Sequence, residues 1–224
     1  MSGEAASGLF GTELSKRIAS AIVLVAIAVP IILLGGLPFF LMCLALTLIL
    51  NFEWFSMVRK ASVSRLWYLF GIPYAAIPIL CLPFIREQPS PDGLWLILLL
   101  FLVVWASDIF AYFAGRHFGG PKLMPTVSPN KTWSGAIGGL SGALLVGFVF
   151  AIYVDLSPVM AVVGSVIMSV FSQAGDLFES WFKRRFGVKD SSNLIPGHGG
   201  FLDRVDGLLT AVLPLSLYLL LTTA

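Results

Sequence analysis

The sequence has little charge, few histidines and only two cysteines. Charged residues make up 12% of its 224 residues, whereas 58% are apolar, and the mean hydropathy is +0.93. So apolar a composition argues against a soluble domain. Cys43 and Cys81 both lie in apolar runs, so no disulfide framework is indicated. With two histidines in the chain, His198 has too few partners for a zinc site.

What the chain has instead is a series of apolar runs. Each approaches or exceeds the roughly 18 residues that a transmembrane helix needs. They are residues 18–37, 38–57, 66–85, 94–113, 134–154, 158–181 and 206–223. The sequence therefore predicts an all-α integral membrane protein with about seven transmembrane helices. The first run resembles a signal peptide, but its length and the run that follows at once favour a retained helix.

The basic residues indicate how the chain crosses the membrane. With a cytoplasmic N-terminus, thirteen of the fourteen lysines and arginines fall in the cytoplasmic segments, 1–17, 58–65, 114–133 and 182–205. Only Arg86 falls outside, which is the bias that the positive-inside rule predicts. The C-terminus is then expected outside. This topology depends on a tight turn at residues 35–38, Gly-Gly-Leu-Pro, between the first two runs.

Several carboxylates lie near the cytoplasmic ends of these runs. They are Glu53, Asp108, Asp176, Glu179, Asp203 and Asp206. Ionisable groups in a bilayer are costly and normally face a polar cavity or a partner. We therefore predict one polar cavity that opens to the cytoplasm, with Asp108 and Tyr112 in its wall. For Glu53 the favoured interpretation is an interfacial side chain that extends to the headgroups. For Glu179 both interpretations remain open.

Residues 180–207 hold eight of the chain's 26 charged residues. Asp203 and Asp206 are three apart, so on a helix both carboxylates lie on one face, near an N-terminus that attracts anions. Two such carboxylates suit a divalent cation, and Mg²⁺ prefers few carboxylates together with water and substrate phosphates. Asp176 completes the predicted set of metal ligands.

Cations and glycines accompany these carboxylates. Lys183, Arg184, Lys189 and Arg204 suit phosphate binding, although Lys183, Arg184 and Arg185 also fit a topological anchor. The glycine-rich turn that contains His198, Gly199 and Gly200 allows close approach of the backbone and resembles loops that bind phosphate through their amides. His198 is expected either to donate to phosphate or backbone or to stabilise the turn. Together these residues predict a metal–nucleotide or metal–pyrophosphate site.

A second polar cluster precedes the fifth run. Ser128 and Thr132 supply hydroxyls and Lys131 a cation, which suits a phosphate at a helix N-terminus. A capped helix start after a proline turn explains the same residues equally well.

The chain resembles the phosphatidate cytidylyltransferase family, also called CDP-diacylglycerol synthases. The family signature is matched at Ser180, Phe182, Lys183, Arg184, Lys189, Asp190, Ser192, Ile195, Pro196, His198, Gly199, Gly200, Phe201, Asp203, Arg204, Val205 and Asp206. Detailed similarity covers residues 100–224, and the first hundred residues match only as apolar spans. The chain is shorter than typical bacterial members, by about two spans in its first half.

The resemblance implies the reaction of CTP with phosphatidate to give CDP-diacylglycerol and pyrophosphate, with one or two Mg²⁺ ions, in phospholipid biosynthesis. It implies catalytic roles for Asp203, Asp206, Lys189, Asp190 and Arg204. It also implies CTP and membrane phosphatidate as partners, a homodimer, no nucleic acid, and a bacterial cytoplasmic membrane. The chain would then comprise a cytoplasmic segment (1–17), three scaffold spans (18–93) and a catalytic region of four spans (94–224).

Three other functions are considered. Polyprenol and phytol kinases transfer a γ-phosphoryl group to a lipid alcohol, but the complete signature disfavours them. A relative that binds lipid without turnover is disfavoured because no signature residue is missing. A transporter is disfavoured because the polar residues gather on one side and not at the midplane.

Overall fold

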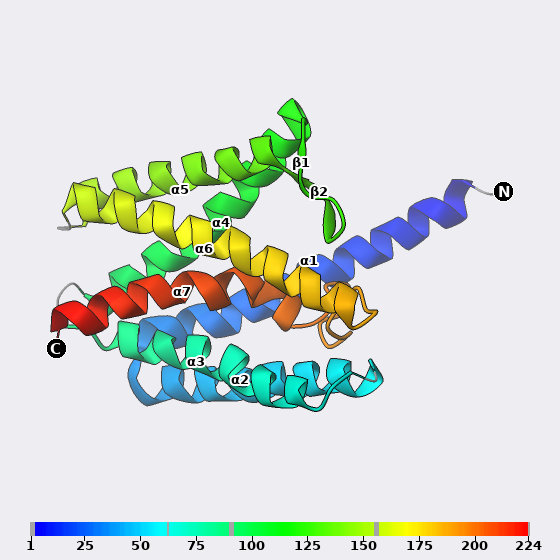
Figure 1. The fold of residues 1–224 in the computed structure, drawn as a ribbon, viewed down its shortest axis with the longest axis horizontal. Helices are drawn as coiled ribbons and strands as arrows, with labels where there is room; N and C mark the ends of the chain where they lie inside the picture. The colour runs from blue at the N-terminus through cyan, green and yellow to red at the C-terminus, as the bar shows by residue number, and fades with distance from the viewer. Residues whose placement is uncertain (1–2, 62, 90–91, 155–156, 224) are drawn as a thin grey trace.

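The computed structural model describes residues 3–61, 63–89, 92–154 and 157–223 and is mainly helical (Figure 1). The helices are α1 (Gly3–Leu34), α2 (Gly36–Lys60), α3 (Leu66–Arg86), α4 (Gly93–Phe118), α5 (Trp133–Tyr153), α6 (Pro158–Arg185) and α7 (Leu202–Thr223). Between α4 and α5 stand two short strands, β1 (Lys122–Met124) and β2 (Ser128–Thr132). Of the predicted segment 1–17, residues 3–17 are helical, but the side chains of Lys16 and Arg17 lie outside the described ones.

Six helices, α2 to α7, are long and apolar enough to cross a membrane. The first predicted run corresponds to the apolar end of α1, Ile18–Leu34, which is shorter. Large apolar side chains also face outward throughout the bundle; Leu48 and Phe52 on α2 are 65% and 62% exposed. So much exposed apolar surface fits a lipid environment and not water. The predicted all-α membrane fold is therefore confirmed, with six long spans and a shorter apolar helix.

The turn on which the topology depends is present. α1 ends at Leu34 and α2 begins at Gly36, and Gly35 and Gly36 adopt φ angles of 67° and 54°. Such positive φ angles strongly favour glycine. Arg86, at the end of α3, stabilises the junction by donating to the carbonyls of Ile32 and Leu33. The one basic residue outside the predicted cytoplasmic segments therefore caps the end of α1.

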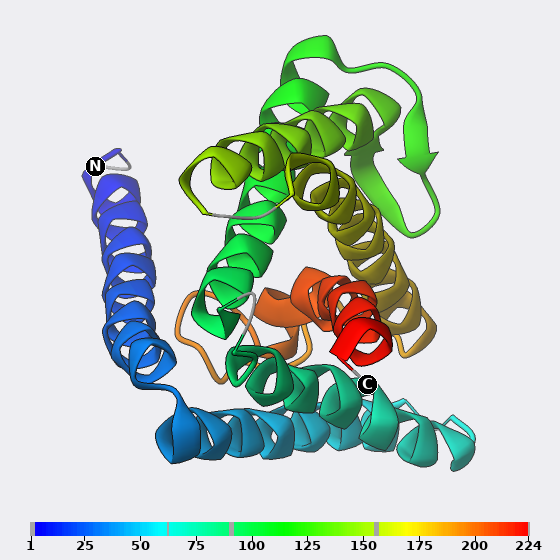
Figure 2. The same ribbon diagram turned by 90° about the vertical axis from the view of Figure 1, so that its left-hand side faces the viewer.

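α7 packs against α6, α3 and α4. α2 and α3 lie side by side below it, while α6 and α5 lie above it (Figure 1). α1 turns away from α2 at the Gly35 junction (Figure 2). The hairpin β1–β2, the α6–α7 loop and the connection between α2 and α3 share one end of the bundle, opposite the C-terminus (Figure 1). The segments predicted to be cytoplasmic therefore lie together.

An aromatic core joins the first half of the chain to the second. Trp54 on α2 is fully buried and donates through Nε1 to the carbonyl of Trp67 at 2.7 Å. Its ring meets Phe182 of α6 edge to face, with the ring centroids 4.6 Å apart. Tyr74 of α3 contacts both rings. Edge-to-face aromatic pairs contribute beyond the area that they bury, so α2 and α3 are firmly attached to α6.

Small residues allow α6 and α7 to approach closely. A Cβ atom at Gly175 would lie 2.0 Å from Thr210 Oγ1 and 2.9 Å from the carbonyl oxygen of Asp206. A Cβ atom at Gly207 would lie 2.4 Å from Ser172 Oγ. Small residues at such contacts are a common means of packing membrane helices. Since Asp176 follows Gly175 and Asp206 precedes Gly207, this contact brings the two aspartates together.

The hairpin between α4 and α5 was not predicted from the sequence. β1 and β2 pair antiparallel, with Lys122 opposite Thr132 and Met124 opposite Ser128. Strands of three and five residues give no measurable alternation, and Pro129 argues against a strand. A two-stranded ribbon has only edges, so it tolerates this proline.

Candidate active site

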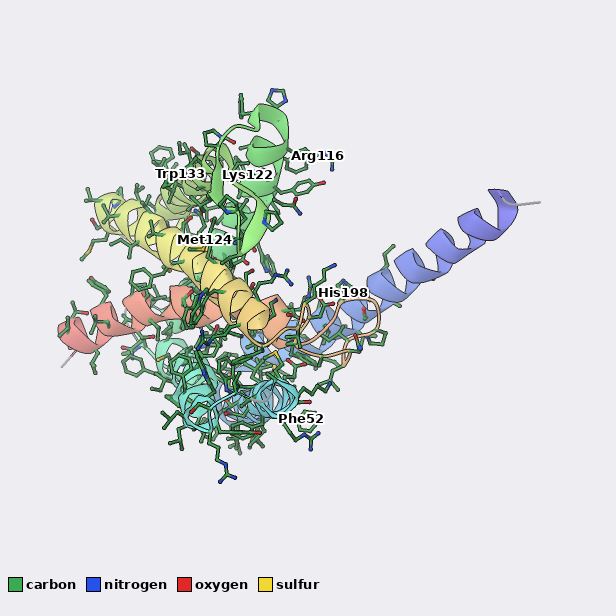
Figure 3. The ribbon with its side chains drawn as sticks, turned by 45° about the vertical axis from the view of Figure 1, so that its right-hand side comes forward. Phe52, Arg116, Lys122, Met124, Trp133 and His198 are labelled. Carbon is green, nitrogen blue, oxygen red and sulfur yellow. The ribbon has the colours of Figure 1, made fainter. Side chains whose placement is uncertain are left out.

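A cavity of about 680 Å³ opens between α4, the hairpin, α5 and α6. Its polar lining comprises Asp108, Tyr112 and Arg116 from α4, Lys122 from β1, Asn130, Lys131 and Thr132 from β2, and Gln173 and Asp176 from α6. This volume lies within the range of small-molecule sites. Figure 3 shows Arg116 near the end of α4 and Lys122 on the hairpin that follows it. Asp108 and Tyr112 line this cavity, and their role in a site that opens to the cytoplasm stays a prediction.

Opposite charges meet across this cavity. Lys131 of β2 forms an ion pair with Asp176 of α6, and the two side chains are 28% and 33% exposed. Thr132 Oγ1 accepts a hydrogen bond from the N–H of Gly135, so Thr132 is the N-cap of α5. The cap interpretation of Thr132 is confirmed, and its phosphate role stays a prediction. Ser128 lies at the other end of β2 and is absent from the described lining of the cavity.

Asp206 and Glu179 lie behind the cavity, at the α6–α7 contact. Asp206 is close enough to Asp176 and Asp108 for their charges to interact, and Glu179 interacts in the same way with Asp206. The Glu179 side chain is fully buried. Lys183 Nζ lies 2.9 Å from its Oε1, whereas Oε2 has no hydrogen-bond donor in the described part of the chain. Burial of Glu179 excludes the interfacial interpretation.

The loop between α6 and α7, residues 186–201, folds on itself around a tight turn. The N–H of His198 donates to the carbonyl of Ile195, and the N–H of Ile195 donates to that of Gly199. Pro196 and Gly197 occupy the centre of the turn, and Gly197 has a φ of 75°. A Pro-Gly pair in these positions is typical of a type II turn. Gly197 thus serves the turn itself.

Asp203 is occupied by donors from its own chain. Its carboxylate accepts from Lys183 Nζ at 2.7 Å, from the N–H and hydroxyl of Ser191, and from the N–H of Gly200. Its side chain is only 6% exposed. Lys183 is in turn held between Glu179 and Asp203. Asp203 and Lys183 therefore stabilise the loop in this structure.

Glu53 is the residue that the sequence interpreted wrongly. It does not extend to the membrane surface but is fully buried, against the start of α7. Its carboxylate accepts four hydrogen bonds, from the hydroxyls of Ser191 and Ser192 and from the N–H groups of Phe201 and Leu202. The amides that were expected to bind phosphate are thus partly occupied: Gly200 donates to Asp203 and the next two residues to Glu53.

The remaining predicted residues lie around the loop. Arg204 donates through Nε and Nη2 to the carbonyl of His198. His198 Nδ1 lies 3.0 Å from Ser20 Oγ, which places the loop beside α1 (Figure 3). Lys189, Asp190 and Arg184 are exposed to solvent. These three residues are free to face a ligand, and their catalytic or phosphate-binding roles stay predictions.

The three predicted metal ligands, Asp176, Asp203 and Asp206, do not lie together in one place. In the described part of the chain, no group of three or more His, Cys, Asp or Glu side chains is arranged to hold a metal ion. Asp176 lines the cavity and Asp206 lies behind it, whereas Asp203, in the first turn of α7, is held by donors of the α6–α7 loop. Their assignment as a set of three ligands stays a prediction.

Comparison with known proteins identifies the family. A model of the cytidylyltransferase family matches residues 64–222. The chain belongs to the cytidylyltransferase family. This confirms the resemblance that the signature indicated, and it identifies the chain, with its six long apolar helices, as an integral membrane protein.

Curated relatives in this family carry the name phosphatidate cytidylyltransferase. One from Brucella abortus biovar 1 (strain 9-941) is 39% identical over 257 residues, covering 92% of this chain and 93% of its own. One from Rickettsia bellii is 40% identical over 207 residues, covering 88% and 87%. One from Haemophilus influenzae is 53% identical over 126 residues, covering 54% and 44%. The Brucella alignment is longer than the 224 residues of this chain, so it includes gaps.

Proposed function

We propose that this family member is a phosphatidate cytidylyltransferase, which converts CTP and phosphatidate into CDP-diacylglycerol and pyrophosphate. The observation that carries the proposal is the cavity between α4, the hairpin and α6. It combines carboxylates with cations at one end of a set of apolar helices. The names of the Brucella and Rickettsia relatives supply the substrates.

The proposed chemistry needs positioning and charge neutralisation more than a strong base. A phosphatidate oxygen attacks the α-phosphorus of CTP, the bond to the β-phosphate breaks, and pyrophosphate leaves. The attacking phosphate is already anionic near neutral pH, so the main barrier is to bring two anions together. Arg116, Lys122 and Lys131 line the cavity and would lower that barrier by binding phosphate oxygens in a fixed arrangement.

The residues around the cavity fit a divalent cation. Asp176 and Asp206 are close enough for their charges to interact, and Oε2 of Glu179, which interacts with Asp206, lacks a donor in the described structure. Mg²⁺ accepts few carboxylates and completes its shell with water and phosphate. Asp176 and Asp206 would hold it, and it would supply charge neutralisation at the transferring phosphate. Asp203 fits less well, because its oxygens already accept from Lys183, Ser191 and Gly200.

We also propose that this end of the bundle faces the cytoplasm. Lys122 and Lys131 on the hairpin and Arg184 and Arg185 beside the α6–α7 loop stand at the same end, and the C-terminus stands at the other (Figure 1). The positive-inside rule assigns such an end to the cytoplasm. A bacterial cytoplasmic membrane is part of the proposal, since the relatives named above are bacterial, and the homodimer stays a prediction.

The test is a product analysis of the purified chain. Protein in detergent–phosphatidate micelles is incubated with labelled CTP and Mg²⁺, and pyrophosphate and labelled lipid are measured. We expect both products, and we expect both to disappear with EDTA. CDP and a phosphorylated lipid alcohol, in a parallel assay with prenols, would instead identify a kinase. Folded protein that binds CTP without turnover would contradict the proposal.

A further inference from the structure

Glu53 connects the first half of the chain to the start of α7. Oε1 accepts from Ser192 Oγ at 2.5 Å and from the N–H of Phe201 at 2.9 Å. Oε2 accepts from Ser191 Oγ at 3.2 Å and from the N–H of Leu202 at 2.8 Å. A buried carboxylate with four donors is both anchored and costly to replace. Glu53 therefore fixes two separate stretches of the chain, residues 191–192 and 201–202.

The arrangement of donors shows why this position needs a carboxylate. Each oxygen of Glu53 receives one hydroxyl and one backbone N–H. A hydroxyl can rotate and accept, but a backbone N–H can only donate. A glutamine would thus satisfy both serines and one amide, while its NH₂ group faced the other amide. The backbone at Phe201 and Leu202 selects the charged side chain.

The anchored backbone leads directly to the candidate site. Leu202 is the first residue of α7, and Asp206 follows four residues later, against Gly175 and Asp176 of α6. The contact between Glu53 and the loop is also tight, since a Cβ atom at Gly200 would lie 2.6 Å from Glu53 Oε1. A displacement of the first turn of α7 therefore moves Asp206 relative to Asp176.

We propose that Glu53 is a positioning residue for the transfer reaction: it holds the first turn of α7 so that Asp206 stays beside Gly175 and Asp176 of α6, of which Asp176 lines the cavity. The inference rests on the function proposed above. It assigns to α2, outside the signature of residues 180–207, a part in building the site. Both oxygens of Glu53 are occupied by donors of the loop and of α7. Glu53 therefore acts through Asp206 and not on the substrate.

The test compares Glu53→Gln with Glu87→Gln. Glu87 is a matched control, because its Oε1 accepts from the N–H of Gly36 at the start of α2, away from the cavity. We expect Glu53→Gln to lower kcat about 10²-fold, the scale of a misplacement near 1 Å, with KM for CTP within about threefold. Glu87→Gln is expected to keep kcat. Ser192→Ala, which leaves both amide contacts in place, is expected to lose less than about tenfold in kcat.

A second measurement does not depend on turnover. Hydrogen–deuterium exchange in detergent reports the protection of the Phe201 and Leu202 amides. We expect Glu53→Gln to speed exchange there at least about tenfold, while the amides of α4 and α5 stay unchanged. Glu53→Asp, which keeps the charge but shortens the side chain, is measured in the same way and replaces Glu53→Gln if that variant aggregates.

The two measurements separate failure of this inference from failure of the proposed function. Unchanged exchange at Phe201 and Leu202, or an unchanged kcat in Glu53→Gln, overturns the positioning role. A uniform rise in exchange across all helices also overturns it, because Glu53 would then support only global stability. If the wild-type chain forms no CDP-lipid, the proposed function fails, while the exchange data still decide whether Glu53 anchors α7.

Discussion

The carboxylates that hold the α6–α7 loop, Glu53 and Asp203, and those at or behind the cavity, Asp176 and Asp206, have opposite surroundings. Glu53 and Asp203 each have four donor groups of the chain itself within hydrogen-bond distance, and the single hydroxyl proton of Ser191 is shared between them. Four is about the number that a carboxylate can accept. In the described structure Asp206 accepts only from the N–H of Gly207, and Asp176 only pairs with Lys131. Saturated carboxylates build the loop, and unsaturated ones remain available to a ligand.

The largest expected effect comes from Asp176 and Asp206, the carboxylates with few hydrogen-bond donors in the described structure. Asp176→Asn and Asp206→Asn each remove a charge that would hold the cation and keep the side-chain shape. We expect a loss of about 10³-fold in CDP-lipid formation, equivalent to about 4 kcal/mol, with thermal stability unchanged or raised. Pyrophosphate release and thermal unfolding in detergent measure the two quantities. Activity within tenfold of wild type in both variants would remove these residues from the site.

The next largest effect is expected on the free energy of unfolding, when Asp203, whose carboxylate is surrounded by donors, is replaced. Asp203→Asn leaves Lys183 without one of its two carboxylate partners in a buried setting. Removing one member of a buried ion pair costs about 3–5 kcal/mol, and we expect about 3 here because Glu179 still pairs with Lys183. Unfolding in detergent measures the loss. If Asp203→Asn loses activity but no stability, Asp203 belongs with the cavity carboxylates and the comparison fails.

Substitutions of two glycines of α6, Gly175 and Gly164, test whether the close α6–α7 contact supports the site. Gly175→Ala would place a Cβ atom 2.0 Å from Thr210 Oγ1, whereas at Gly164 on the same helix a Cβ meets nothing within 4 Å. Overpacking of this kind costs about 1–3 kcal/mol, so we expect about 2 kcal/mol and a fall in activity for Gly175→Ala. Gly164→Ala is the control and is expected to lose neither. Equal behaviour of the two variants would contradict the close contact.

Much of the fold could be predicted because a bilayer imposes long apolar helices. The runs of apolar residues gave six long spans, and Gly35 and Gly36 gave the turn between α1 and α2. The hairpin was missed because its strands are too short for periodicity and contain Pro129. α7 begins at Leu202, four residues before its apolar run, so Asp203 and Asp206 lie near its N-terminus as the sequence indicated. Glu53 caps α7 from another helix.

The site was predictable as a collection of residues but not as an arrangement. Asp108, Tyr112, Lys131, Thr132 and Asp176 were singled out and do line one cavity. The division of Asp203 from Asp206 was not visible, because three-residue spacing gives a shared face but not the donors around it. Glu53 was misjudged for the same reason: its partners lie about 140 residues away along the chain. A signal existed in its position within an apolar run, where a carboxylate needs partners.

The smallest predicted effect separates the two roles open to Thr132. Its hydroxyl is occupied by the N–H of Gly135, so Thr132→Ala should cost about 1 kcal/mol, the usual value of an N-cap. KM for CTP is then expected to stay within twofold of the wild-type value. Ser141→Ala, which removes an exposed hydroxyl that donates to the carbonyl of Ile137 on the same helix, is the control. A KM for CTP raised tenfold in Thr132→Ala and restored in Thr132→Ser would show instead that the hydroxyl binds phosphate. Thr132 lines the cavity although its hydroxyl already accepts from the N–H of Gly135. That result would show that a side chain with a partner in its own chain can still bind a ligand. The distinction between groups with and without such partners would then hold only for the carboxylates.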